Sequence, residues 1–125
     1  MHTPTRALGR HIILELYDCP EELLKYPPAS EKFLLEAAEA MQATVVSSSF
    51  HAFSPYGVSG VVIIQESHLT IHTWPEHCYA AVDIFACGPL QLEKGVEYLC
   101  QAFQAKRHWQ RELERGTVLM AEKPQ

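Results

Sequence analysis

The chain has 125 residues and a formal net charge of −5, with 15 acidic side chains against 10 basic ones. A chain of this length fits one domain, whose core buries roughly two-thirds of the surface that the unfolded chain exposes. The acidic balance disfavours a nucleic-acid reader, which needs a dense basic face, and the longest aliphatic run falls far short of the roughly 20 residues that cross a bilayer. We therefore expect a folded domain with no nucleic-acid or membrane partner.

The four cysteines favour free thiols over a disulfide framework. They include no Cys-x-x-Cys pair, and residues 1–6 do not lead into an apolar signal segment. Disulfide frameworks belong to exported chains, so we expect reduced cysteines and a cytoplasmic location.

The first third of the chain predicts a strand, a helix and the start of a second strand. His11–Tyr17 is short and apolar, and Asp18-Cys19-Pro20 ends it. Ser30 is the predicted N-cap of a helix over residues 31–42, in which apolar side chains recur at three- and four-residue spacing. A strand restarts at Thr44-Val45-Val46.

The middle of the chain predicts three further strands. Ser54-Pro55-Tyr56-Gly57 has the proline and glycine of a turn. Beyond it we expect strands over Val58–Gln65, Ser67–Trp74 and Tyr79–Ala86, with Pro75 interrupting the second of them.

A second helix over Leu92–Phe103 and a last strand over His108–Glu114 complete the pattern. Short turns rather than helical crossovers join the neighbouring strands. This favours the α+β class, as a two-layer sandwich of an antiparallel sheet with two helices on one face. The other face then lacks a cover, so we expect a homodimer in which the sheets of two copies face each other.

Reactive side chains gather in the middle of the chain. On an extended strand, His68 and His72 share one face and Ser67 lies on the other. The strand rise separates the two imidazoles by about 13 Å, too far to share one zinc ion without a bend, so no metal is expected. A hydrogen-bonded histidine face and a structural Cys87 are the simplest alternatives to a polar site around Ser67, His72 and Cys87, whose reaction these residues do not name.

Two side chains near the turns leave their roles open. Phe53 either packs the hairpin or stacks on a planar ligand. Glu76, which follows Pro75, is either a solvated turn acid or a ligand contact.

Two long ordered strings stand out: Phe50-His51-Ala52-Phe53-Ser54-Pro55-Tyr56-Gly57-Val58-Ser59-Gly60 and Glu66-Ser67-His68-Leu69-Thr70-Ile71-His72-Thr73-Trp74-Pro75-Glu76. Together with Leu8-Gly9-Arg10-His11 and residues 79–88, they closely resemble the short prokaryotic S-adenosylmethionine decarboxylase proenzymes. The resemblance covers the chain from about Leu8 to Gly88, and so long an ordered match is highly specific.

The resemblance implies that the chain cleaves itself between Glu66 and Ser67, into a β chain of residues 1–66 and an α chain of residues 67–125. The Ser67 hydroxyl would attack the Glu66 carbonyl and form an ester. Elimination of the Glu66 carboxylate and hydrolysis would then convert Ser67 into a pyruvoyl group, the covalent cofactor of the family.

The resemblance also assigns roles to single residues. His72 would remove the Cα proton during processing, and Ser59 would support the attack by polarising the carbonyl. In the mature enzyme the pyruvoyl ketone would form a Schiff base with S-adenosylmethionine and act as the electron sink. Cys87 matches the proton donor, Phe53 the residue against adenine and Glu76 the residue near the ribose. The product would be the aminopropyl donor for spermidine synthesis.

One stretch departs from the family. Close relatives tend to read Glu-Tyr-Gly-Tyr where this chain has Glu76-His77-Cys78-Tyr79, which adds a side chain at a bend and a second thiol. The processing motif also occurs in relatives that act on arginine or ornithine, although the aromatic turn Phe53–Gly57 favours S-adenosylmethionine. A binding protein that does not cleave itself and a small zinc protein are the remaining alternatives.

Overall fold

The structure, a computed structural model, describes residues 7–117, so residues 1–6, which bear on the expected lack of a signal segment, lie outside it. The helices and strands are β1 (Gly9–Tyr17), α1 (Pro27–Ala40), β2 (Val45–Ala52), β3 (Val58–Ile64), β4 (Ser67–Trp74), β5 (Tyr79–Ala86), α2 (Leu92–Ala102) and β6 (Arg107–Arg115). Two short 3-10 helices, η1 (Glu21–Leu23) and η2 (Pro75–His77), lie in connections.

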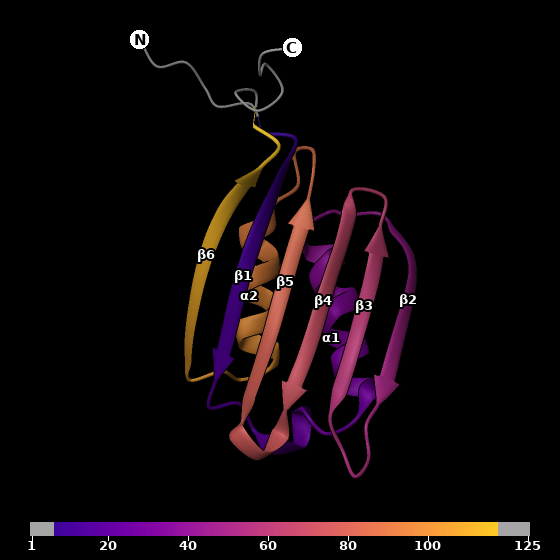
Figure 1. The fold of residues 1–125 in the computed structure, drawn as a ribbon, viewed down its shortest axis with the longest axis vertical. Coiled ribbons are helices and arrows are strands. Elements are labelled where there is room, and N and C mark those ends of the chain that lie inside the picture. Colours follow the sequence, from indigo (N-terminus) through magenta and orange to yellow (C-terminus); the bar gives the residue numbers. More distant parts are fainter. Residues whose placement is uncertain (1–6, 118–125) are drawn as a thin grey trace, which may run out of the picture.

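Six strands form one sheet in the order β2-β3-β4-β5-β1-β6. Every neighbouring pair is antiparallel. Both helices lie on the same side of the sheet, and the opposite side, which we call the open face, carries none (Figure 1). The predicted α+β class is confirmed.

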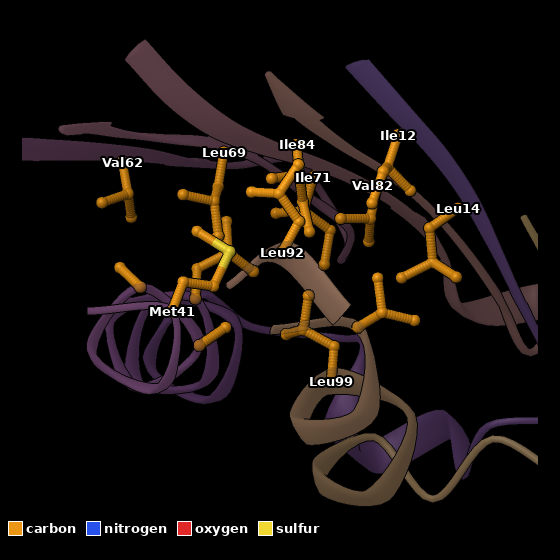
Figure 2. Close-up of a cluster of buried hydrophobic side chains, with 14 of the residues drawn as sticks. Ile12, Leu14, Met41, Val62, Leu69, Ile71, Val82, Ile84, Leu92 and Leu99 are labelled. Carbon is orange, nitrogen blue, oxygen red and sulfur yellow. The ribbon is translucent and has the colours of Figure 1, made fainter. Parts of the chain in front are cut away.

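The alternation of side chains in the central strands explains why one face is covered. In β5 each second residue is buried, beginning with Ala80. In β4, Leu69, Ile71 and Thr73 are buried, which turns His68 and His72 toward the open face. The inward side chains meet those of the helices in one apolar layer, in which Leu69 and Ile84 from the sheet lie above Met41, which follows α1, and Leu99 of α2 (Figure 2).

The first helix begins earlier than predicted. α1 starts at Pro27 after the extended Tyr26, and Ser30 lies inside the helix. Ser30 is therefore not the N-cap; it is fully buried, and its hydroxyl makes no hydrogen bond within the described chain. The missed signal is the Pro27-Pro28 pair, because proline at the first helical positions loses no hydrogen bond and already has a helical φ.

The second helix is predicted correctly and packs closely on the first. A side chain at Gly95 of α2 would place its Cβ 2.6 Å from the Met41 sulfur. A glycine therefore lets the two helices approach each other. None of the helices among residues 7–117 is long and apolar enough to span a membrane.

The connections between the central strands lie at two opposite ends of the sheet. The turn between β3 and β4 lies at its upper end, and the β2–β3 and β4–β5 connections lie together at its lower end (Figure 1). The candidate residues divide between these two ends.

Candidate active site

The upper end is built on a tight turn. Gln65 and Glu66 alone connect β3 to β4, so Ser67, the first residue of β4, pairs with Ile64. The Gln65 N–H donates to the Thr44 carbonyl at 2.8 Å, and the Thr44 N–H donates to Glu66 Oε1 at 3.2 Å. These bonds hold the Glu66–Ser67 peptide in a fixed place beside the connection from α1 to β2.

The Glu66 carbonyl oxygen accepts two hydrogen bonds from Cys87. This residue follows β5, whose last residue, Ala86, pairs with Ser67. The Cys87 N–H donates to the Glu66 oxygen at 3.0 Å, and the Cys87 thiol donates to the same oxygen at 3.2 Å. Donors in this position stabilise the negative charge that forms on a carbonyl oxygen when a nucleophile attacks its carbon.

The backbone of Ser67 is strained. Its φ is +153°, in a region that residues other than glycine rarely occupy, at a cost of about 1–3 kcal/mol. Its Oγ lies 3.4 Å from Nδ1 of His68, although strict strand alternation places neighbouring side chains on opposite faces. The hydroxyl beside the Glu66 carbonyl is therefore also beside an imidazole.

A hollow of about 330 Å³ opens at this end, with Glu66, Ser67, Phe85, Cys87 and Arg115 among its walls. We call Glu66, Ser67 and Cys87 the upper half-site. Its nucleophilic groups reach the surface, since Cys87 is exposed and its thiol is free.

Burial distinguishes two of the other thiols from Cys87, which is exposed. It raises the pKa of Cys19 to about 12 and also raises the pKa of Cys100. A thiol that keeps its proton in an apolar environment is a poor nucleophile. Cys87 is instead an exposed thiol that contacts the Glu66 carbonyl oxygen.

The lower end holds an imidazole in ordinary strand geometry. Ser59 of β3 pairs with His72 of β4, and Ser59 Oγ is hydrogen-bonded to His72 Nδ1 at 2.8 Å. A hollow of about 310 Å³ includes these two side chains together with Phe53 and Glu76. We call Phe53, Ser59, His72 and Glu76 the lower half-site.

The loop that carries Phe53 is tied to the chain around it. The Phe53 N–H donates to the Gly57 carbonyl at 2.9 Å, and the Gly57 N–H donates to the Lys25 carbonyl at 2.9 Å. Gly57 has a φ of +119°, which glycine tolerates better than other residues. Beneath the loop, the Thr73 hydroxyl donates to the Leu24 carbonyl at 2.8 Å. The ring of Phe53 is 49% exposed above this frame.

The two half-sites are apart within one chain. Ser67 and His72 are five residues apart on β4, a separation of about 16 Å at the rise of a strand. The structure thus brings Glu66, Ser67 and Cys87 together and, separately, Phe53, Ser59, His72 and Glu76.

Two contacts at the upper end were missed by the sequence interpretation: the Cys87 N–H on the Glu66 carbonyl, and His68 on the Ser67 hydroxyl. The first was open to prediction, because antiparallel strands that meet at Ser67 and Ala86 bring the next residue beside Glu66. The second depends on the unusual φ of Ser67, which strand periodicity does not reveal. Among residues 7–117, no group of three side chains could hold a metal ion.

The fold and the two half-sites define an α+β protein whose reactive groups lie at the strand ends of an open, helix-backed sheet. A sequence model described as S-adenosylmethionine decarboxylase matches residues 10–116. The chain belongs to the S-adenosylmethionine decarboxylase family, whose enzymes depend on a pyruvoyl group.

Individual relatives agree with this assignment. The S-adenosylmethionine decarboxylase proenzyme of Thermosipho melanesiensis is 56% identical over 103 residues, which cover 82% of this chain and 79% of that one. The proenzyme of Thermotoga maritima is 51% identical over 112 residues, covering 89% and 86%. The crystal structure of the adenosylmethionine decarboxylase from Aquifex aeolicus matches with a TM-score of 0.85 and 33% identity, over 96% of this chain and 99% of that one.

Proposed function

We propose that this chain is a proenzyme that cleaves itself between Glu66 and Ser67 and then decarboxylates S-adenosylmethionine in the cytoplasm. The product is the aminopropyl donor for spermidine synthesis. The observation that carries the proposal is the Glu66 carbonyl, which accepts hydrogen bonds from the Cys87 N–H and thiol and adjoins the strained Ser67. The free state of all four cysteines agrees with a reducing compartment.

The cleavage step follows from this arrangement. Ser67 Oγ attacks the Glu66 carbonyl carbon, the two Cys87 donors stabilise the oxyanion, and the C–N bond breaks to leave an ester and a free amine. Loss of the Ser67 Cα proton then expels the Glu66 carboxylate, and hydrolysis of the remaining dehydroalanine releases ammonia. Fragments 1–66 and 67–125 result.

The upper half-site fits the group that this chemistry would make. A pyruvoyl group derived from Ser67 would stand at the start of β4, where the strand stays paired with β5 and faces the upper hollow. Such a group supplies a carbonyl that accepts the electrons released when CO₂ leaves the substrate. The exposed Cys87 thiol adjoins this position and donates the proton that the substrate carbon then needs.

The separation of the half-sites supports a dimer in which each active site uses two chains. His72 is the base for the Cα proton, with Ser59 orienting its ring, yet it lies about 16 Å from Ser67 on the same strand. Two open faces packed in opposite directions would place the upper half-site of one copy against the lower half-site of the other.

The side chains on the open face agree with such packing. Ile63 and Trp109 are 41% and 51% exposed. Ile63 of β3 pairs with His68 of β4, and Trp109 of β6 pairs with Glu15 of β1. Both apolar side chains lie on the side of the sheet that no helix covers. Exposed apolar side chains on one face are typical of a surface that another protein covers.

The lower half-site supplies substrate recognition. The exposed Phe53 ring would stack on adenine, and the Glu76 carboxylate would accept hydrogen bonds from the ribose hydroxyls. The aromatic side chains of this hollow would also favour the positive sulfonium. Arginine and ornithine have no planar purine for Phe53 to contact, which supports S-adenosylmethionine as the substrate.

The test is the intact mass of the purified protein under denaturing conditions, followed by turnover with S-adenosylmethionine, arginine and ornithine. We expect fragments 1–66 and 67–125, a blocked terminus on the second, and CO₂ release from S-adenosylmethionine. Ser67→Ala is the control that stays uncleaved. A wild-type chain that stays in one piece after prolonged incubation would contradict the proposal and indicate a binding role, and preferred turnover of arginine or ornithine would contradict the substrate.

A further inference from the structure

Self-cleavage requires a group that takes the proton of the attacking hydroxyl. We propose that His68 is the general base that activates Ser67 for cleavage of the Glu66–Ser67 bond. The inference rests on the proposed self-cleavage and assigns a catalytic residue to its first step. The contact that carries it joins His68 Nδ1 and Ser67 Oγ, 3.4 Å apart.

The other titratable groups of the upper end are engaged elsewhere. The Glu66 carboxylate accepts a hydrogen bond from the Thr44 N–H. The Cys87 thiol donates to the Glu66 carbonyl oxygen, so it acts on the electrophile and not on the nucleophile. Among the described residues, His68 is the base in hydrogen-bonding contact with Ser67 Oγ.

The backbone conformation of Ser67 makes this contact possible. Adjacent side chains on a regular strand point to opposite faces, which would turn the hydroxyl away from the imidazole. A φ of +153° at Ser67 departs from the regular strand. The unusual backbone at this residue thus has a chemical consequence, since it brings the hydroxyl of the residue that follows Glu66 within 3.4 Å of the imidazole.

Packing holds the His68 ring in this position. Its ring centroid lies 5.8 Å from that of Phe85, and His68 pairs with Ile63 of β3 and Phe85 of β5. The Arg115 guanidinium also lies over the Phe85 ring, 5.7 Å from its centroid. With Nδ1 toward the serine, the reactive form carries its hydrogen on Nε2 and keeps a lone pair on Nδ1.

The proposed step balances without an additional reactant. His68 Nδ1 takes the proton from Ser67 Oγ as Oγ bonds to the Glu66 carbonyl carbon. The C–N bond then breaks, and the proton passes from the imidazolium to the leaving nitrogen, which becomes the free amine of residue 67. His68 ends the step neutral.

The experiment measures the rate of cleavage and not decarboxylation. Full-length chains are made by cell-free synthesis, quenched in denaturant at intervals, and the cleaved fraction is read by intact mass. A general base contributes about 10²- to 10⁴-fold, so we expect His68→Ala to cleave about 100-fold more slowly. Free imidazole should restore part of that rate. His108→Ala, which removes an exposed histidine from β6, should cleave at the wild-type rate.

A second variant separates proton transfer from positioning. In His68→Asn the amide oxygen takes the place of Nδ1 and still accepts the serine hydrogen bond, but it does not take up the proton. We expect His68→Asn to be as slow as His68→Ala, with its thermal unfolding close to that of the wild type.

Three results would overturn the assignment of His68 as the general base. They are a His68→Ala chain that cleaves within twofold of the wild type, a His68→Asn chain that keeps the wild-type rate, and a slow, folded His68→Ala chain that imidazole does not accelerate. The last would make His68 a packing partner of Phe85. A wild-type chain that never cleaves would overturn the proposed function as well, so the two failures are distinguishable.

Discussion

The upper half-site holds its nucleophile in a strained backbone, whereas the lower half-site holds its imidazole in a regular strand. Ser67 has a φ of +153°, while His72 pairs in register with Ser59 and is hydrogen-bonded to it. The proposed function explains the difference. The Glu66–Ser67 peptide reacts once and is lost, so its strain of about 1–3 kcal/mol is released by cleavage and favours it. The lower half-site must keep its geometry through every turnover.

The largest expected effect comes from separating the two half-sites into different chains. Ser67→Ala and His72→Ala chains, each alone, should stay uncleaved, because one lacks the nucleophile and the other the base for elimination. Co-expressed with tags of different mass, they should form mixed dimers in which the intact Ser67 of one chain meets the intact His72 of the other. The His72→Ala chain should then be cleaved, up to the fraction of it present in mixed dimers, as measured by intact mass.

The control is co-expression of two differently tagged His72→Ala chains, which offers no intact His72. If mixed dimers form and the His72→Ala chain stays whole, each chain must use its own half-sites. The separation of about 16 Å between the two half-sites would then have to close within one chain, and the upper and lower half-sites would not be separate.

The second effect concerns Cys87, whose N–H serves only cleavage in the proposed function, whereas its thiol serves both cleavage and decarboxylation. Cys87→Ala keeps the N–H that stabilises the Glu66 oxyanion but loses the thiol that protonates the substrate carbon. We expect CO₂ release from the cleaved enzyme to fall by about 100-fold or more, with self-cleavage slowed by about 10-fold or less, since one of two donors remains. Steady-state turnover and the time course of cleavage measure the two effects. Full turnover in Cys87→Ala would refute its role as proton donor.

A smaller effect is expected at Phe53, which in the proposed function binds substrate and takes no part in cleavage. Phe53→Ala should raise KM for S-adenosylmethionine by about 10-fold, because a stacking contact contributes about 0.5–1.5 kcal/mol beyond the area that it buries. Phe53→Tyr keeps the aromatic face and should stay within about twofold of the wild type. The initial-rate dependence on substrate concentration gives both values. A Phe53→Ala chain with unchanged KM would remove the assigned adenine contact.

Strand periodicity predicted most of the fold because the central strands are buried on one face only. Strand alternation predicted that His68 and His72 share one face, and the structure confirms this and shows that it is the open face, opposite the buried Leu69 and Ile71. The start of the first helix was wrong because Ser30 has the chemistry of an N-cap but lies one turn inside α1, buried under the sheet. Tertiary packing determines that burial, and the local sequence does not express it.

The site was predicted as a set of residues rather than as an arrangement. Residue chemistry predicted a polar site around Ser67, His72 and Cys87, and the resemblance to a family added the other positions and the roles, but these three side chains do not come together within one chain. The information to see this was present: the rise that separates His68 from His72 by about 13 Å also separates Ser67 from His72 by about 16 Å. The φ of Ser67 was out of reach, since it depends on how the Gln65-Glu66 turn is held by Thr44.

The smallest effect tests whether strain at the lower end has a function. Cys78, which follows η2 at a position where the resemblance predicted glycine, has φ +52° and ψ +39°, the left-handed conformation. Cys78→Gly should raise the free energy of unfolding by about 1 kcal/mol. Removing the side chain relieves a cost of about 1–2 kcal/mol in this conformation, and the greater freedom of glycine in the unfolded chain offsets part of that gain. Urea unfolding at one protein concentration, in a Ser67→Ala background that keeps the chain whole, measures the difference. Cys78→Ala keeps the steric cost and should not be stabilised.

In the cleavable background, Cys78→Gly should leave the cleavage rate and KM unchanged, unlike any replacement of Ser67. The backbone strain at Ser67 would then affect the reaction, whereas the strain at Cys78 would lower only the stability of the fold. A several-fold rise in KM would instead show that the Cys78 side chain helps to hold Glu76, two residues away in η2. In that case both ends of the sheet would use a strained residue, one to break a peptide bond and the other to place a carboxylate.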